Sequence, residues 1–368
     1  MAPRTFLLFT IFLISLLSVT QAHDIAPSSN DLSIDYLFQF GDSISDTGNL
    51  VIQDPINAHN FASFPYGITL HKATGRCSDG LLMIDQFAKF FNKPFLNPYL
   101  DRQANFSQGV NFAVAGSTAL DTATLQNMGV MSPVTTSSLN VQLDWFRTHL
   151  ESICDTALDC QEKLSRSLVL IETGGNDYNY AMLQGKPMDQ VRDMVPQVVD
   201  TIKNAAKQVI GYGATRVYIP GNFPIGCLPI YKATFGNDYT LDKMDCLDGL
   251  NDFARFHNAY IKTAVKELRK EYPEVDVVYG DYYSALSSVL KNAGPLGFDV
   301  PNKFKACCGS GDNGYNFNLM RICGSQGDEV CGDPSKFVSW DGIHMTQETY
   351  KRMSQWLLPR LVRQLNNI

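Results

Sequence analysis

Ser43 lies in a polar turn, Gly-Asp-Ser-Ile-Ser-Asp, that follows an apolar run at residues 36–40. Such a run is typical of a buried strand, and the carboxyl end of a parallel strand is where open α/β sheets bind ligands. A serine there can present its hydroxyl at a helix N-terminus. Taken alone, the segment is more typical of an ordinary turn, because Asp and Ser dominate turns and N-caps. A catalytic role therefore requires partners elsewhere in the chain.

A serine hydroxyl is a weak nucleophile and needs a base that a third group holds in the right tautomer. His257 falls in the helix-like segment 250–271, where we expect it to be packed or solvated. His344 instead stands in a polar turn before the last helix, and Asp341 three residues upstream can fold back onto it. With Ser43, these two residues can form a nucleophile, a base and an orienting carboxylate. Without a matching serine they fit a loop histidine beside a turn aspartate equally well.

Two Gly-rich segments offer hydrogen-bond donors for the oxyanion that acyl transfer creates. Residues 109–117 carry small side chains, so their backbone amides can approach a ligand closely. Asn176 follows the strand-like run 168–173 and supplies a side-chain amide beyond a strand end. Either segment alone fits a tight turn without chemistry. The neighbouring Asp177, Tyr178 and Tyr180 can bind a cationic amine or be ordinary surface residues.

The elements that must position these residues alternate between apolar runs and amphipathic segments, which predicts a parallel sheet covered by helices on both faces. The strand-like runs are 36–40, 168–173, 216–220 and 275–279, and the helix-like segments are 188–211, 250–271 and 347–365. We therefore expect a three-layer α/β/α sandwich. Because no repeat or linker divides the chain, we expect a single domain over residues 23–368. Residues 294–336, rich in Gly, Asn and Cys, form a long excursion with a structural rather than a binding role.

Nine cysteines suit an oxidising compartment, and their odd number leaves one thiol over. Cys154 and Cys160 can close a small loop, and Cys227 and Cys246 a larger one. Four more crowd the excursion 294–336, namely Cys307, Cys308, Cys323 and Cys331. Zinc is the alternative for these four, but two adjacent cysteines do not form the C-x-x-C pair that wraps a tetrahedral ion. Disulfides of undetermined connectivity, and no metal, are therefore expected.

The 368 residues are 45% apolar and 18% charged, the composition of a folded protein with a sizeable core. A formal net charge of -7 leaves no broad basic surface, which argues against nucleic acid and anionic membranes as partners. Residues 1–22 place Arg4 before an apolar run and end in small residues at Ala22, as in a cleaved signal peptide. A membrane anchor is the alternative, but the run is shorter than the roughly 20 residues of a spanning helix. Export from the cell follows, and Asn105, in an Asn-Phe-Ser sequon, is a glycosylation candidate in a surface loop.

The four chemical segments, in this order, resemble the four blocks of the GDSL esterase/lipase family of SGNH hydrolases. These blocks are G-D-S near the mature N-terminus, a glycine loop, G-x-N-D, and D-x-x-H near the C-terminus. The resemblance covers essentially the whole mature chain and implies a flavodoxin-like α/β/α fold. It implies Ser43 as nucleophile, His344 as base and Asp341 as its orienting partner. It further implies an oxyanion hole formed by Ser43, Gly116 and Asn176, with no metal or organic cofactor.

Several stretches, among them residues 220–227, look like the plant branch of that family. Met345 replaces the proline that follows the histidine in many plant members, and residues 74–82, 131–139 and 174–181 resemble the subgroup with acetylajmalan esterase and sinapine esterase. This implies a small-molecule substrate, a small acyl ester such as the acetyl ester of an alkaloid. The alternatives are a cell-wall polysaccharide acetylesterase, a lipase, and a secreted defence or binding protein that keeps the fold without turnover. The natural ester and the oligomeric state stay open.

Overall fold

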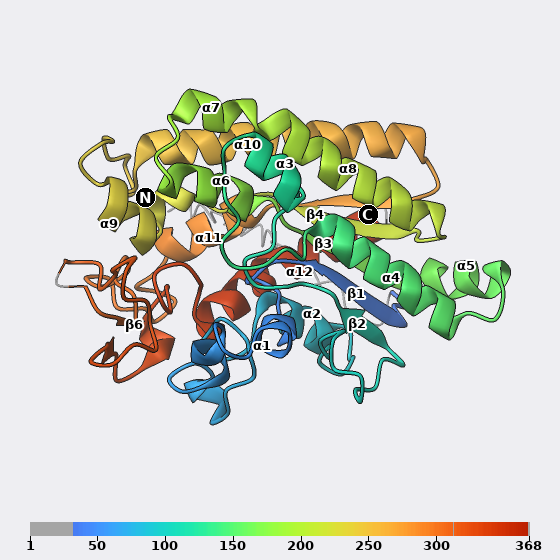
Figure 1. The fold of residues 1–368 in the computed structure, drawn as a ribbon, viewed down its shortest axis with the longest axis horizontal. Helices are drawn as coiled ribbons and strands as arrows, with labels where there is room; N and C mark the ends of the chain where they lie inside the picture. Colours follow the sequence, from blue (N-terminus) through green and yellow to red (C-terminus); the bar gives the residue numbers. More distant parts are fainter. Residues whose placement is uncertain (1–31, 312, 367–368) are drawn as a thin grey trace, which may run out of the picture.

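The computed structural model describes residues 32–311 and 313–366, so the predicted signal peptide at residues 1–22 lies outside the described part. A five-stranded sheet runs through the middle of the molecule (Figure 1). Its strands are β1 (Tyr36–Gly41), β2 (Gly109–Asn111), β3 (Ser167–Glu172), β4 (Arg216–Pro220) and β5 (Asp276–Gly280). They lie in the order β2-β1-β3-β4-β5, and every neighbouring pair is parallel. This is the flavodoxin-like order.

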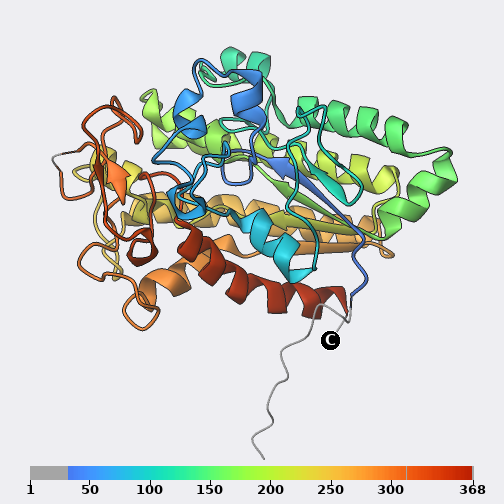
Figure 2. The same cartoon turned by 90° about the horizontal axis from the view of Figure 1, so that it is seen from below.

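Helices cover both faces of the sheet, as Figures 1 and 2 show. On one face α4 (Leu139–Ile153) and α10 (Asp248–Glu271) both contact α8 (Val195–Gly211). On the other face α2 (Met83–Phe90) and α11 (Tyr282–Lys291) both contact α12 (Gln347–Leu365). Since strands between two helix layers meet no water, every residue of β3 is buried. The predicted three-layer sandwich is confirmed.

Shorter elements make the connections between these layers. The remaining helices are α1 (Asn49–Gln53), α3 (Thr122–Asn127), α5 (Ala157–Ser165), α6 (Gly175–Leu183), α7 (Met188–Asp193) and α9 (Pro229–Phe235). Single 3-10 turns occur at His59–Ala62, Ile68–Leu70, Ile225–Cys227 and Pro334–Lys336. Within the excursion 294–336, β6 (Cys308–Gly309) pairs antiparallel with β7 (Glu329–Val330). The excursion therefore stays outside the main sheet.

Helix α12 anchors the C-terminal part of the chain to the core. Met353, Leu357, Leu361 and Leu365 recur every fourth residue and are at most 6% exposed, so they form one buried face. Burying each such side chain typically stabilises the fold by about 1.5–3 kcal/mol. Thr346 is the N-cap of the helix, and its hydroxyl accepts the backbone N–H of residue 349. The polar turn just before this cap is thereby held at the start of a packed helix.

The predicted elements agree with the structure to within two residues at most ends, with two exceptions. The segment 188–211 was expected as one helix but is divided into α7 and α8. Pro196 lies at the start of α8, where its missing N–H and its ring disfavour a continuous helix. Strand β2 was not predicted, because three residues inside a Gly-rich segment carry too short a pattern to distinguish from a loop.

Four disulfides cross-link the described part of the chain. Two of them, Cys154–Cys160 and Cys227–Cys246, join the pairs that the sequence suggested. The crowded cysteines of the excursion pair as Cys307–Cys331 and Cys308–Cys323, and Cys77 is the remaining, buried thiol. The excursion is therefore pinned by disulfides, as expected.

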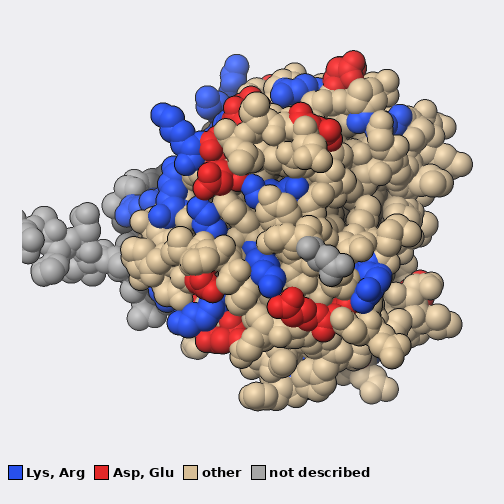
Figure 3. Space-filling model, turned by 90° about the vertical axis from the view of Figure 1, so that its left-hand side faces the viewer, with Lys and Arg blue, Asp and Glu red and all other residues tan. Residues whose placement is uncertain are grey.

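One face of the molecule carries charges of both signs. On the face drawn in Figure 3, Lys and Arg side chains lie close to Asp and Glu side chains, and large areas carry neither. No helix of residues 32–311 and 313–366 is long and apolar enough to cross a membrane.

Candidate active site

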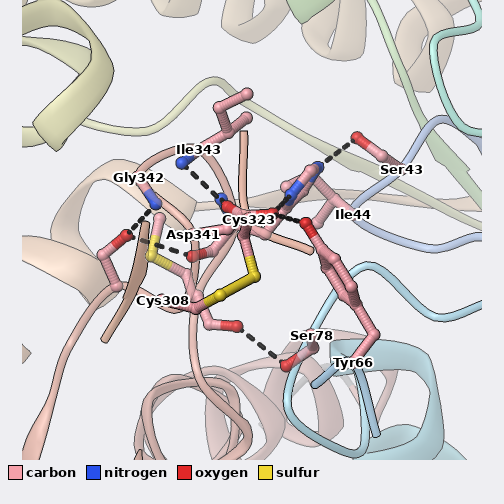
Figure 4. Close-up of polar contacts among 12 residues, drawn as sticks. Ser43, Ile44, Tyr66, Ser78, Cys308, Cys323, Asp341, Gly342 and Ile343 are labelled. Carbon is pink, nitrogen blue, oxygen red and sulfur yellow. Dashed lines mark hydrogen bonds and ion pairs between the residues drawn. A yellow bond between two sulfur atoms is a disulfide. The ribbon is translucent and has the colours of Figure 1, made fainter. Parts of the chain in front are cut away.

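Ser43 and His344, 301 residues apart in sequence, are in hydrogen-bond contact (Figure 4). His344 Nε2 lies 2.7 Å from Ser43 Oγ, and His344 Nδ1 lies 2.6 Å from Asp341 Oδ2. Ser43 follows β1, whereas the other two residues precede α12. His344 and Asp341 are buried, but Ser43 is only half-buried. The three predicted residues thus form one continuous chain of hydrogen bonds that ends at a hydroxyl open to a ligand.

Asp341 fixes the tautomer of His344. Burial opposes the ionisation of Asp341, but the attraction of His344 and hydrogen bonds outweigh it, so the pKa of this carboxyl lies below its usual value. The backbone N–H groups of His344 and Ile343 donate to Asp341 Oδ1 at 2.8 and 3.0 Å. Because an ionised carboxylate only accepts, the imidazole proton is assigned to Nδ1. His344 Nε2 is then free to accept the hydroxyl proton of Ser43.

The turn that carries Ser43 is held by its own aspartate and by the neighbouring strand. Asp42 Oδ1 accepts the backbone N–H of Ile44 at 3.0 Å, and Asp42 O accepts that of Ser45 at 3.1 Å. The hydroxyl of Ser45 donates to Glu172 Oε2 at 3.0 Å, at the end of β3. The Ser43 hydroxyl is therefore presented from a backbone that is fixed on both sides.

Gly116 lies in a conformation that only glycine adopts readily. Its φ is 82°, and a Cβ at this position would stand 2.4 Å from the side chain of Val134. The hydroxyl of Tyr180 donates to Gly116 O at 2.8 Å. The glycine loop is thus held in one conformation, and Tyr180 serves that loop.

Asn176 lies in the first turn of α6 and lines the same pocket as Ser43. Its Nδ2 donates to Ser117 O at 2.9 Å, and its Oδ1 accepts from Asn179 Nδ2 at 3.2 Å. These two contacts fix which way the amide points. Since a side-chain amide has two N–H donors, one of them stays available for a ligand.

Two buried aspartates, whose structural role the sequence did not reveal, hold the glycine loop on either side of Gly116. Asp46 Oδ2 accepts the backbone N–H of Ala115 at 2.8 Å. Asp177 accepts the backbone N–H groups of residues 119 and 120, both at 2.9 Å. Asp46 belongs to the turn of Ser43, and Asp177 follows Asn176. The three segments that carry the predicted site are therefore tied to one another by carboxylate to backbone hydrogen bonds.

The suggestion that Asp177 and Tyr178 bind a cationic amine or lie on the surface is wrong, because both are fully buried. Tyr178 Oη lies 2.9 Å from His257 Nδ1, and burial lowers the pKa of His257 to about 4. His257 is therefore a packed, neutral histidine of α10, the first of the two alternatives, packed or solvated, that the sequence left open. Sequence composition alone gives no signal of this burial, since Asp and Tyr are most often partly exposed.

A pocket opens beside Ser43 at the carboxyl ends of β3 and β4. The space open to the centre of a water molecule is about 60 Å³. Its walls are Asp42, Ser43, Ile44, Glu172, Thr173, Gly175, Asn176, Asn179, Pro220, Gly221, Asn222, Phe223, Ile225, Leu228, Ile230, Tyr231, His257 and Ile343. Among the residues that the structure describes, no three His, Cys, Asp or Glu side chains are grouped to hold a metal ion.

Two carboxyl groups in the pocket wall are buried together. Burial raises the pKa of Asp42 to about 6, against the opposing effects of the Ile44 N–H and of His344. Burial and, next, the charge of Asp42 raise the pKa of Glu172 well above its usual value.

The chain is similar to known proteins over most of its length. The family model described as GDSL-like lipase/acylhydrolase matches residues 37–357. Acetylajmalan esterase 1 of Rauvolfia serpentina is 42% identical over 337 residues, which cover 90% of this chain and 88% of that protein. Acetylajmalan esterase 2 of the same plant is 40% identical, covering 99% and 98%. A GDSL esterase/lipase of Arabidopsis thaliana is 42% identical, covering 94% and 87%.

Asp42→Asn removes a carboxyl whose pKa is raised to about 6 but keeps an oxygen for the Ile44 N–H. Between about pH 4 and about pH 6, the folded protein holds this proton while the unfolded chain has released it, so ionisation of Asp42 lowers the free energy of unfolding as pH rises. We expect the stability of the variant relative to wild type to improve by up to about 3 kcal/mol across this window. Urea unfolding at several pH values measures the difference.

The control is Asp144→Asn, at a side chain that is 72% exposed, which should leave the pH dependence as in wild type. If Asp42→Asn and wild type changed stability in parallel at every pH, the raised pKa of Asp42 would be wrong.

Proposed function

The chain belongs to the GDSL-like lipase/acylhydrolase family and is a carboxylic ester hydrolase, and we propose that Ser43 is its nucleophile, His344 its base and Asp341 the carboxylate that orients the base. The hydrogen bonds of 2.7 Å from His344 to Ser43 and of 2.6 Å from His344 to Asp341 carry this proposal. They are the contacts that deprotonation of a serine by a tautomer-fixed imidazole requires.

In the first step His344 Nε2 accepts the Ser43 proton while Oγ forms a bond to the ester carbonyl carbon, and the carbonyl π electrons move to its oxygen. When the carbon–oxygen double bond re-forms, the bond to the alkoxy oxygen breaks. The imidazolium donates its proton to that leaving alcohol. Asp341 stabilises the imidazolium in between without taking its proton.

In the second step water replaces the alcohol. His344 accepts a proton from water as the water oxygen attacks the acyl carbon, and the Ser43 oxygen leaves with the proton from the imidazolium. The acid is released and the enzyme returns to its starting state. The reaction consumes only the ester and water.

The negative oxygen formed in each step needs fixed donors. We assign the backbone N–H of Ser43, the backbone N–H of Gly116 and the remaining Nδ2 proton of Asn176 to this oxyanion hole. The assignment is supported by the fixed amide orientation of Asn176 and by the glycine-only conformation at residue 116.

The substrate proposed is a small acyl ester, acetyl in the first instance, of a plant specialised metabolite such as an alkaloid. The pocket beside Ser43 can receive the acyl group, and its wall includes the apolar side chains of Ile225 and Leu228. Two relatives at 40–42% identity are named acetylajmalan esterases, which supports the same class here. A polysaccharide acetylesterase or a lipase are the alternatives that a substrate panel separates.

We further propose that residues 1–22 direct export and are removed, and that residues 23–368 form a single domain. Four disulfides favour an oxidising compartment, such as the apoplast or the vacuole. Asn105 is exposed in a loop before β2, which supports its use as a glycosylation site.

Asn176→Ala removes one proposed oxyanion donor and should lower kcat about 100- to 1,000-fold. KM should change little, because the donor acts mainly on the transition state. The matched control is Asn140→Ala, an exposed residue of α4, which should retain wild-type kcat. Steady-state kinetics on p-nitrophenyl acetate measures both. A kcat for Asn176→Ala within a fewfold of wild type would remove this residue from the oxyanion hole.

Acetyl esters should be hydrolysed much faster than long-chain esters. The panel is acetylated alkaloids, choline esters, acetylated sugars and p-nitrophenyl esters of increasing chain length, tested with wild type and with Ser43→Ala. Selective deacetylation of alkaloids that is lost in the variant is the expected result. Faster cleavage of long acyl chains would favour a lipase, and preference for acetylated sugars would favour the polysaccharide esterase.

A further inference from the structure

We propose that Tyr66 is a positioning residue of the proposed triad: its hydroxyl holds Asp341 in place and limits how strongly this carboxylate retains a proton on His344. The inference rests on the proposed roles of Asp341 and His344. Tyr66 lies 275 residues before Asp341, and its sequence context showed no chemical motif.

Tyr66 reaches the same carboxylate oxygen as the base does (Figure 4). Its hydroxyl donates to Asp341 Oδ2 at 2.8 Å, and His344 Nδ1 lies 2.6 Å from that oxygen. The other oxygen, Oδ1, accepts the two backbone N–H groups of the turn. Asp341 is thus satisfied by four donors, of which Tyr66 is the one from outside its own turn.

The ring of Tyr66 is locked by its neighbours. It is 1% exposed and packs edge to face against Trp340, with ring centroids 5.9 Å apart, and against Phe61 at 5.0 Å. Trp340 precedes Asp341 in sequence, so the ring touches both the carboxylate and its neighbour. The disulfides of the excursion belong to the same buried cluster. Because the ring cannot rotate away, its hydroxyl acts as a fixed donor.

The hydroxyl stays protonated at all pH values at which the enzyme can work. Burial, and then the charge of Asp341, raise the pKa of Tyr66 well above its usual value. As a permanent donor, the Tyr66 hydroxyl offsets part of the negative charge on Asp341. The carboxylate then stabilises the imidazolium of His344 less strongly. Without the hydroxyl, Asp341 would hold the imidazolium proton more tightly, and one restraint on the carboxylate would be lost.

The other titratable groups around Asp341 and His344 are the same in wild type and in a Tyr66→Phe variant. They are Asp42 in the turn of Ser43, Cys77 after the Tyr66 segment, Asp328 in the excursion and Tyr350 on α12. Burial raises the pKa of the Cys77 thiol and of the Tyr350 hydroxyl well above their usual values, so both stay neutral. The carboxyl groups of Asp42 and Asp328 are present in wild type and variant alike. A difference between the two pH profiles therefore reports the Tyr66 hydroxyl.

Tyr66→Phe removes this hydroxyl and keeps the packed ring. We expect kcat on p-nitrophenyl acetate to fall about tenfold, as for loss of one hydrogen bond to a charged group. The acidic limb of the kcat/KM profile should move to higher pH, because a more basic His344 must lose its proton before it can act. The control is Tyr218→Phe, which removes a hydroxyl that is buried, contacts no hydrogen-bonding partner among the described residues and lies outside the triad.

Thermal unfolding of both variants separates stability from catalysis, and kinetics are compared at a temperature where both are folded. A lower kcat together with a shifted acidic limb in Tyr66→Phe alone supports the inference. An unshifted limb overturns it, whether kcat is unchanged or falls through lost stability. Ser43→Ala measured in parallel tests the proposed function separately, since an active Ser43→Ala protein would reject the triad whatever Tyr66 does.

Discussion

An ionised carboxylate inside a protein is costly unless hydrogen bonds replace its lost water, and Asp341 is such a group. Its donors are the imidazole of His344, two backbone N–H groups of its own turn and the hydroxyl of Tyr66. Satisfying this one charge fixes the turn, the tautomer of the base and the segment around Tyr66. The cap of α12 and the disulfide-pinned excursion hold the same turn from outside.

A second set of buried carboxylates holds the glycine loop in place by accepting backbone N–H groups. Asp46, from the serine turn, accepts the backbone N–H of Ala115 in this loop. Asp177, from the asparagine segment, accepts those of residues 119 and 120 just after the loop. The side chain of Gln142 forms further hydrogen bonds to the backbone of Gly41 and to the hydroxyl of Ser117. Polar residues that surround the proposed nucleophile and oxyanion donors therefore serve mainly to set the distances between three loops.

The sequence predicted the parts of the molecule whose signal is local. Long apolar runs identified four of the five central strands. The order of four short motifs pointed to Ser43, His344 and Asp341, which the structure brings into hydrogen-bond contact. Tyr66 could not be found, because its role depends on a contact across 275 residues. The burial of Asp177, the brief strand β2 and the pairing of the four crowded cysteines likewise depend on tertiary neighbours. Local patterns carry no information on such neighbours.

The most direct test of the account is to find which residue a fluorophosphonate labels. The reagent reacts with a serine only when a nearby base activates it, so peptide mass spectrometry of the labelled wild-type protein reports the nucleophile. The account predicts a single adduct on Ser43 that is lost in His344→Gln, because that variant keeps the fold but not the base. An adduct on another serine, or equal labelling of Ser43 in both proteins, would contradict activation of Ser43 by His344.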